Sequence, residues 1–114
     1  MKILVTLRDD DIAPRFDLTT EVLIVETGNS TPDANPRNIL LPGASADELC
    51  SLIIKEGVTL VICGGIEDAH FQYLGWKKIQ VIDKVIGPAA EALRLAQAGL
   101  LQTGAIVGQG VTPP

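Results

Sequence analysis

The sequence predicts an α/β fold in which about three helices cover a mixed five-stranded sheet, and three observations support this class. Hydrophobic residues make up 46% of the 114 residues and aromatic residues only 4%, so the core must consist mainly of aliphatic side chains. Short aliphatic runs, typical of strands buried on both faces, recur along the chain. In the second half of the chain these runs alternate with segments of helical periodicity, which is typical of parallel βαβ units.

Five aliphatic runs carry the strand pattern. The first ends abruptly at three aspartates, and the second ends at a stretch rich in Gly, Pro, Asn and Asp that indicates a turn or a longer loop. The third is short and ends at Pro42 and Gly43, as expected of an edge strand. The predicted strands comprise residues 2–7, 20–27, 37–42, 58–63 and 79–83.

Three segments carry the helix pattern. In the first, Ser45 is a good N-cap and Glu48 follows three residues later, which makes a capping box, while Gly57 supplies the C-terminal stop. The third begins near Pro88 and ends at Gly99. The predicted helices comprise residues 45–57, 67–78 and 87–99.

The order of these elements restricts the topology. The first three strands are close enough in the chain for antiparallel hairpins, whereas the last two each arrive by a helical crossover and should be parallel to their neighbours. A sheet in the order 3-2-1-4-5 follows, which is the ribonuclease H-like arrangement. We expect residues 1–101 to form a single domain. Residues 102–114 should form a C-terminal tail, although residues 105–107 could pack against the domain.

Charge and cysteine content exclude several classes of protein. The formal net charge is −5 and the isoelectric point is about 4.6, so a general nucleic-acid-binding surface is not expected. No segment is long and apolar enough to span a membrane, and the N-terminus lacks the pattern of a signal peptide. The two cysteines form no C-x-x-C pattern and define no disulfide scaffold. We therefore expect a soluble protein of the cytoplasm.

Two unusual loops should meet at one edge of the predicted sheet. The first strand leads into RDDDIAPRFD, residues 8–17, and the fourth into CGGIEDAH, residues 63–70. Because ligands bind beyond the carboxyl ends of strands in open α/β sheets, this edge is the predicted binding site. Gly64 and Gly65 would let the backbone approach a ligand, and the start of the next helix could receive an anion. A tight strand-to-helix turn explains the same glycines equally well.

Cys63 and His70 are the candidate metal contacts in this region. The Cys63 thiolate could bind a soft metal or a cluster, although the residues themselves favour a small buried apolar side chain. His70 lies near the start of the second predicted helix, where it could contact a metal or an anion, or could pack or face solvent. Cys50 follows the apolar pattern of its helix and is assigned to the core. One histidine and two cysteines cannot complete a tetrahedral zinc site without carboxylates.

The acidic run at Asp9, Asp10 and Asp11 does not indicate an enzyme. Three consecutive side chains point in different directions and cannot all face one metal ion, and the fourth strand ends without the carboxylates that a two-metal nuclease needs. No Ser-His-Asp arrangement is recognisable either. Arg8 and Arg15 flank the run and could either attract an anionic ligand or pair with neighbouring aspartates. We expect a protein without catalytic activity.

Three stretches resemble a known family. At IAPRFDLTTEVLIVE, VICGGI and GPAAEALRLAQAGLL the chain is similar to the dinitrogenase iron–molybdenum cofactor biosynthesis family, which includes carriers of the NifX and NafY type and the carboxy-terminal domain of NifB. The resemblance extends from Met1 to about Leu101. It implies a ribonuclease H-like fold without nuclease activity that carries or stores iron–sulfur or molybdenum–iron–sulfur clusters or their precursors. Its partner would be a metallocluster assembly or recipient protein.

The resemblance carries over residue by residue at the Cys-Gly-Gly end of the fourth strand, residues 63–65. Arg15 occupies the place of the family's loop histidine, Asp17 that of its loop glycine, and Glu67 that of the last glycine of a GGIG stretch. An arginine cannot ligate a metal, but it can pair with an anionic cluster through its N–H groups. His70 is not a position of the family pattern, and the hypothesis is that it compensates for the missing histidine.

Two hypotheses on function follow. In the first, the chain is a small non-catalytic carrier, storage or assembly protein that binds the iron–molybdenum cofactor or an iron–sulfur or molybdenum–sulfur precursor. In the second, it is a metal-free interaction or regulatory domain that kept the fold and lost the ligand. The cofactor-binding residues of the first hypothesis are Arg15, Cys63, Gly64, Gly65 and His70, with Cys63 and His70 as the metal contacts.

Overall fold

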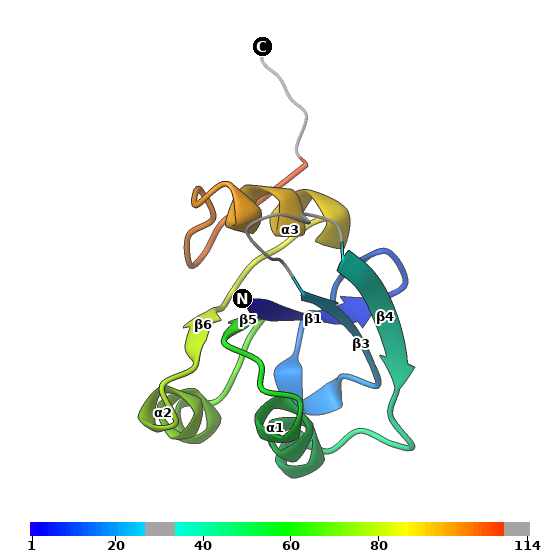
Figure 1. The fold of residues 1–114 in the computed structure, drawn as a ribbon, viewed down its shortest axis with the longest axis vertical. Coiled ribbons are helices and arrows are strands. Elements are labelled where there is room, and N and C mark those ends of the chain that lie inside the picture. Colours follow the sequence, from blue (N-terminus) through cyan, green and yellow to red (C-terminus); the bar gives the residue numbers. More distant parts are fainter. Residues whose placement is uncertain (27–33, 109–114) are drawn as a thin grey trace.

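The computed structural model describes residues 1–26 and 34–108, and these residues form an α/β domain. The strands are β1 (Lys2–Arg8), β2 (Asp11–Ile12), β3 (Glu21–Glu26), β4 (Ala34–Leu40), β5 (Leu60–Ile62) and β6 (Gln80–Ile82). The helices are α1 (Ala46–Lys55), α2 (Asp68–Trp76) and α3 (Ala89–Gln97), together with the short 3-10 helix η1 (Phe16–Leu18). α1 and α2 lie side by side on one face of the sheet, and α3 covers the other face (Figure 1).

The strand pairing confirms the predicted sheet. β1 pairs antiparallel with β3 and parallel with β5, β3 pairs antiparallel with β4, and β5 pairs parallel with β6. Leu4 of β1 therefore lies between Ile24 of β3 and Val61 of β5. The sheet order is β4-β3-β1-β5-β6, which is the predicted order 3-2-1-4-5, with β2 as an additional short strand beside β1.

The sheet separates two apolar layers because successive side chains of a strand point to opposite faces. Leu4 and Val61 belong to the layer under α1 and α2, and Ile3 and Ile62 belong to the layer under α3. All four side chains are fully buried. The central strands are therefore apolar on both faces, which explains why their sequences read as continuous aliphatic runs.

The ends of α1 and α3 follow the predicted signals. Ser45 is the N-cap of α1, and its hydroxyl oxygen accepts a hydrogen bond from the Glu48 N–H over 3.2 Å. Gly57 and Gly99 follow α1 and α3 with φ angles of 72° and 75°, a conformation that favours glycine. α2 is more exposed than the other two helices, because Leu74 is its one buried residue. Among the described helices, none has the length and apolar character needed to cross a membrane.

The chain between β1 and β3 is more structured than the predicted loop. Both β2 and η1 fall within it. The Ala13 N–H donates to the Thr6 carbonyl over 2.9 Å, and the Ile12 N–H donates to the Gly87 carbonyl over 2.9 Å. The first bond belongs to the tight hairpin that β2 forms with β1. The second joins this hairpin to a residue far along the chain, so the local pattern of residues could not predict it.

Two further predicted segments lie partly outside the described residues. The predicted loop at residues 28–36 lies largely outside the described residues. The strand that follows it, β4, begins at Ala34 rather than at residue 37. In the predicted C-terminal tail, residues 105–107 pack against the domain, because the Val107 side chain is buried and its N–H donates to the Ile86 carbonyl over 2.8 Å. Residues 109–114 lie outside the described residues, and the domain boundary at residue 101 stays a prediction.

Candidate functional site

The loops that follow β1 and β5 lie against each other at the carboxyl ends of these strands. Arg15 and Gly65 form an isolated parallel β-bridge. The Gly65 N–H donates to the Pro14 carbonyl over 2.8 Å, and the Phe16 N–H donates to the Gly65 carbonyl over 2.8 Å. The two loops singled out in the sequence are therefore in direct contact, and we refer to this region as the loop contact.

Gly64 makes the loop contact possible. A Cβ atom at this position would lie 2.5 Å from the Pro14 carbonyl oxygen, far inside van der Waals contact. At Gly65 a Cβ atom would lie 3.5 Å from the same oxygen, which is an ordinary contact. The N–H and the carbonyl of Gly65 are both hydrogen-bonded within the chain. This geometry gives the tight-turn interpretation a physical basis, and a ligand role for the glycine pair stays a prediction.

Cys63 follows β5 with its side chain fully buried. Burial, and to a smaller extent the nearby Asp83 carboxylate, raises the pKa of the Cys63 thiol to about 12. The thiol is therefore protonated at neutral pH, whereas a metal binds the thiolate. Cys50 is buried in the same apolar layer, under α1 and α2. Both cysteines thus have the surroundings of small apolar residues, and a metal could reach Cys63 only if the neighbouring chain moved.

Thr6 lies next to Cys63 at the ends of β1 and β5. The register pairs Val5 with Ile62, so the residues that follow them lie side by side. Thr6 is fully buried, and within the described part of the chain its hydroxyl oxygen has no hydrogen-bond partner. A small polar spot therefore interrupts the core beside the loop contact. Sequence reasoning missed it because a threonine at a strand end is ordinary.

Arg15 is exposed and forms an ion pair. Its Nη2 and Nε atoms donate to the two carboxylate oxygens of Asp17 at 2.7 and 3.1 Å. The hydrogen bond from Arg15 holds the pKa of the Asp17 carboxyl below its usual value. Of the two alternatives for Arg15, pairing with a neighbouring aspartate is therefore the one present in this structure.

His70 lies in the first turn of α2, against the other side of the loop contact. Its ring centroid is 6.1 Å from that of Phe16, with an angle of 32° between the ring planes. Its Nε2 atom is 3.7 Å from the Glu67 Oε1 atom. With 22% of its side chain exposed, His70 is partly accessible to solvent. Phe16 thus connects His70 to the loop that carries Arg15.

Charges of alternating sign surround the loop contact. The pKa of Arg15 is raised mainly by its hydrogen bond to Asp17 and more weakly by Glu67. Within the described residues, no group of three or more His, Cys, Asp or Glu side chains is arranged to hold a metal ion.

Arg15 and His70 border different hollows. A groove of about 540 Å³ runs beside the first loop, and two arginines and two acids line it together with apolar side chains and threonines. Its charged and hydroxyl-bearing residues are Arg8, Asp9, Arg15, Thr19, Thr20 and Glu21. A smaller hollow of about 400 Å³ is lined by residues of α1 and α2, including Cys50 and His70. A ligand that touches both Arg15 and His70 must therefore bridge the loop contact.

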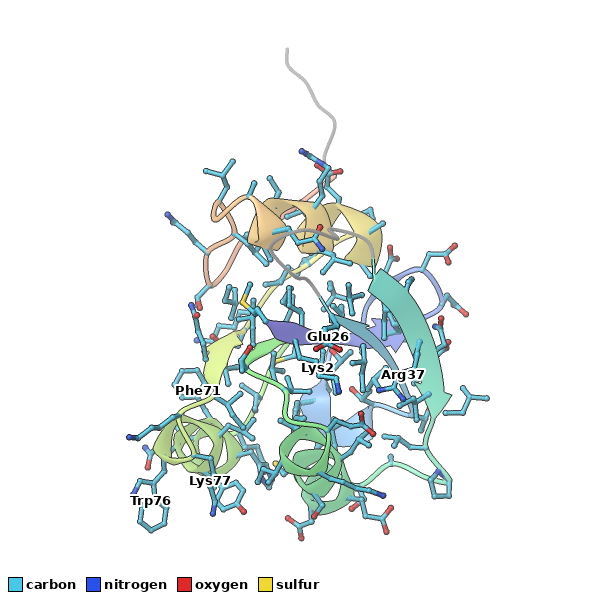
Figure 2. The ribbon with its side chains drawn as sticks, in the orientation of Figure 1. Lys2, Glu26, Arg37, Phe71, Trp76 and Lys77 are labelled. Carbon is cyan, nitrogen blue, oxygen red and sulfur yellow. The ribbon has the colours of Figure 1, made fainter. Side chains whose placement is uncertain are left out.

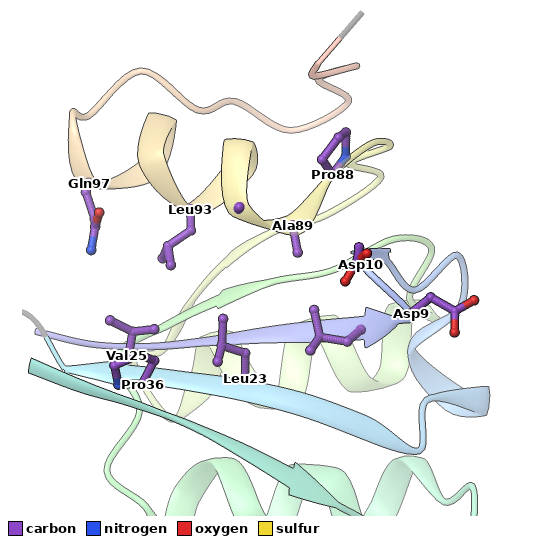
Figure 3. A pocket seen from close by; sticks show the side chains of 11 residues that line it. Asp9, Asp10, Leu23, Val25, Pro36, Pro88, Ala89, Leu93 and Gln97 are labelled. Atoms are coloured by element: carbon purple, nitrogen blue, oxygen red, sulfur yellow. The ribbon is translucent and has the colours of Figure 1, made fainter. Parts of the chain in front are cut away.

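A third hollow, of about 540 Å³, lies between α3 and the sheet (Figure 3). Leu23 and Val25 of β3 lie on its sheet side, Leu93 of α3 faces them, and Asp9 and Asp10 border one end (Figure 3). No sequence pattern indicated this hollow. Alternating apolar residues along β3 predict a face turned to the core, but they do not indicate how much of that face a helix covers.

A match to a known protein family spans the site. The family described as "Dinitrogenase iron-molybdenum cofactor" matches residues 1–99, which include both loops of the loop contact. No curated protein matches the chain.

Solved structures share the fold at low sequence identity. The protein PH0822 gives a TM-score of 0.80 at 19% identity, over 90% of this chain and 94% of that chain. A protein of Methanocaldococcus jannaschii, provisionally assigned as a dinitrogenase, gives a TM-score of 0.72 at 22% identity, over 100% of this chain and 97% of that chain. A Thermotoga protein, provisionally assigned as a NifB protein of the DUF35 family, gives a TM-score of 0.70 at 16% identity, over 96% of this chain and 98% of that chain. At these identities the likeness establishes the fold alone.

Proposed function

Since the chain belongs to the dinitrogenase iron–molybdenum cofactor family, we propose that it is a small metal–sulfur cluster-binding protein without catalytic activity of its own. The match of residues 1–99 to this family is the observation that carries the proposal. The cargo is the iron–molybdenum cofactor or an iron–sulfur or molybdenum–sulfur precursor. The protein acts as carrier, storage or assembly factor in the cytoplasm and exchanges the cargo with a metallocluster assembly or recipient protein.

Arg15 is the residue that we assign to the negative charge of the cargo. Its side chain is 60% exposed and borders the same groove as Arg8. An anionic cluster can accept N–H bonds from the guanidinium in the two-point geometry that Asp17 uses. Because an exposed ion pair contributes little to stability, a multiply charged cargo can displace Asp17 easily.

His70 and Cys63 are the proposed metal contacts, and they differ in access. His70 is partly exposed beside Phe16, so its imidazole is available to a cluster that bridges the loop contact. Cys63 is fully buried and protonated at neutral pH, so it can bind a metal only after the loops separate. We therefore assign His70 to the first contact with the cargo and Cys63 to an opened state. Gly64 and Gly65 hold the Arg15 loop against the start of α2.

A metal-free interaction or regulatory domain is the second candidate, and three observations favour it. Arg15 is paired with Asp17, Cys63 is buried, and both backbone polar groups of Gly65 are bonded within the chain. Such a domain keeps the fold and presents the loop contact to a protein instead of a cluster.

Anaerobic reconstitution separates the two candidates. The purified apo-protein is titrated with tetrathiomolybdate and, in parallel, with an iron–sulfur cluster, while visible absorption and protein-bound Fe and Mo are measured. The carrier function predicts stoichiometric uptake of one of these species. It also predicts that Arg15→Ala and His70→Ala each weaken retention by about tenfold, with the unfolding temperature nearly unchanged.

Arg94→Ala is the matched control for Arg15→Ala. Arg94 also forms an exposed ion pair, with Glu91, but it lies on α3 at the opposite face of the sheet (Figure 1). Uptake should be the same in this variant and in the parent chain. A parent chain that takes up neither species contradicts the carrier function and leaves the interaction domain, for which capture of a protein partner is the next measurement.

A further inference from the structure

α2 exposes most of the aromatic side chains of the protein. The chain contains two Phe, one Tyr and one Trp, and three of these four residues lie on α2. Trp76 is 82% exposed, Tyr73 40% and Phe71 38%, whereas Phe16 is buried in the core. Trp76 points away from the body of the molecule (Figure 2).

These aromatic side chains belong to one surface, which we call the α2 face. It is a shallow hollow of about 630 Å³ lined by Ala69, Phe71, Gln72, Tyr73, Gly75 and Trp76. A Cβ atom at Gly75 would meet no atom within 4 Å, so the hollow is open above this residue. Exposed apolar side chains that lie together and are flanked by polar residues are a feature of interaction sites.

The two ends of the α2 face carry opposite charges. Glu67 and Asp68 lie at the N-terminal end of α2, and Lys77 and Lys78 lie at its C-terminal end. None of the ion pairs found among the described residues involves either lysine. Lys77 lies over the Tyr73 ring, with its Nζ atom 5.7 Å from the ring centroid. From end to end the surface is therefore acidic, then apolar, then basic.

We propose that the α2 face binds the α2 face of a second copy of the chain, as an antiparallel helix pair around a two-fold axis near Gln72. A two-fold interface brings the same surface of both copies together, so every contact occurs twice. An antiparallel arrangement brings the acids of each copy to the lysines of the other. It also brings each Trp76 over Ala69 of the other copy, where the small side chain leaves room for the indole ring.

The charge pattern favours a second copy over other partners. A partner surface of a single sign, such as a nucleic acid or an anionic membrane, would be attracted by Lys77 and Lys78 but repelled by Glu67 and Asp68. A second copy presents both signs of charge in the order that this surface requires. The α2 face lies outside the loop contact, and its association with a second copy does not depend on the cargo.

Concentration-dependent association of the intact chain tests the proposal. Sedimentation equilibrium from about 1 µM to about 500 µM should show a monomer–dimer transition. Trp76 is the only tryptophan, so its fluorescence reports on this surface alone. Its emission should move to shorter wavelength as dimer forms. Trp76→Ala should abolish association and leave the unfolding temperature of the monomer unchanged, because the side chain is exposed.

Charge reversal identifies the partner. Glu67→Lys and Lys78→Asp should each weaken the dimer by at least about fivefold, because these residues face each other in this register and each reversal acts at two symmetric contacts. The chain that carries both substitutions has opposite charges facing again and should associate within about twofold of the parent. Lys78 has a φ angle of 65°, a conformation that aspartate adopts more readily than most residues. Lys84→Asp is the matched control, since Lys84 has a φ angle of 59° and lies outside α2.

Two results would overturn the proposal. One is a chain that stays monomeric over the whole concentration range. The other is a dimer that the double reversal does not restore. A monomer whose Trp76 emission shifts when an acidic peptide is added, and in which Glu67→Lys strengthens that response, would assign the α2 face to a different protein.

Discussion

The guanidinium of Arg15 and the carboxylate of Asp17 form a two-point ion pair, with N–O distances of 2.7 and 3.1 Å, on the loop that follows β1. Both residues differ from the resembled family pattern, which has a histidine and a glycine at these places. In the structure these two side chains act as one unit, because the Asp17 carboxylate accepts two hydrogen bonds from the Arg15 guanidinium and orients it. An anionic ligand at Arg15 must therefore compete with Asp17.

This competition makes a prediction about the acid next to the proposed anion site. Asp17→Asn should raise the affinity for tetrathiomolybdate by about three- to tenfold, because the Arg15 guanidinium is released and a negative charge is removed. An absorbance titration under anaerobic conditions measures the effect. In the Arg15→Ala background the same substitution should change the affinity less. Equal effects in both backgrounds would show that Arg15 does not contact the anion.

The contact between Gly64 and Pro14 predicts a large loss of stability. Gly64→Ala should lower the free energy of unfolding by about 2–4 kcal/mol, because the new Cβ atom would overlap the Pro14 carbonyl oxygen and the loops would have to separate. Urea unfolding followed by circular dichroism measures this loss. Gly65→Ala is the matched control, since its Cβ atom would make an ordinary contact of 3.5 Å. Similar losses in the two variants would contradict the geometry of the loop contact.

The raised pKa of Cys63 predicts a loss of stability in alkaline solution. The folded chain holds the thiol pKa at about 12, from a usual value of 9.0, so folding favours the protonated form. The contribution of this group is complete below pH 9 and is lost as the pH rises toward 12. Between pH 9 and pH 11 the free energy of unfolding should fall by about 2–3 kcal/mol through this residue.

Cys63→Ala isolates that contribution from other alkaline titrations. The variant lacks the thiol at every pH, so its free energy of unfolding should fall less steeply than that of the parent between pH 9 and pH 11. Urea unfolding at several pH values provides the comparison. If both chains lose stability at the same rate, Cys63 is not held as a buried thiol in the native state.

The sequence could predict the sheet and the meeting of the loops, because both depend on patterns along the chain. Continuous aliphatic runs such as that around Val61 identify central strands, and Gly57 and Gly99 mark the ends of helices. Once β1 and β5 are neighbours, their carboxyl ends bring Arg15 and Gly65 together, and no further information is needed.

The sequence could not predict features that depend on distances between separate elements. The Ile12 N–H of β2 donates to the Gly87 carbonyl, and no residue type predicts a bond between segments so far apart in the sequence. The hollow between α3 and the sheet depends on how far Leu93 lies from β3. The sequence left two interpretations of Cys63, a metal-binding thiolate or a small buried apolar side chain. Only its burial in the structure shows that the thiol is protected.

The burial of Val107 predicts that the segment after α3 contributes to stability. Its side chain is 6% exposed within the layer under α3, whereas that of the neighbouring Ile106 is 57% exposed. Val107→Ala should lower the free energy of unfolding by about 1–2 kcal/mol, because two buried methyl groups are lost. Ile106→Ala is the control and should change it by less than about 0.5 kcal/mol.

Truncation after residue 101 tests the predicted domain boundary in the same way. It removes Val107 and also Thr103, whose hydroxyl donates to the buried Asp83 carboxylate over 3.2 Å. The shortened chain should therefore unfold at lower urea concentration than Val107→Ala, because it also leaves a buried carboxylate without its partner. A truncated chain as stable as the parent would support a domain that ends at residue 101. A loss larger than that of Val107→Ala would extend the folded unit through Val107.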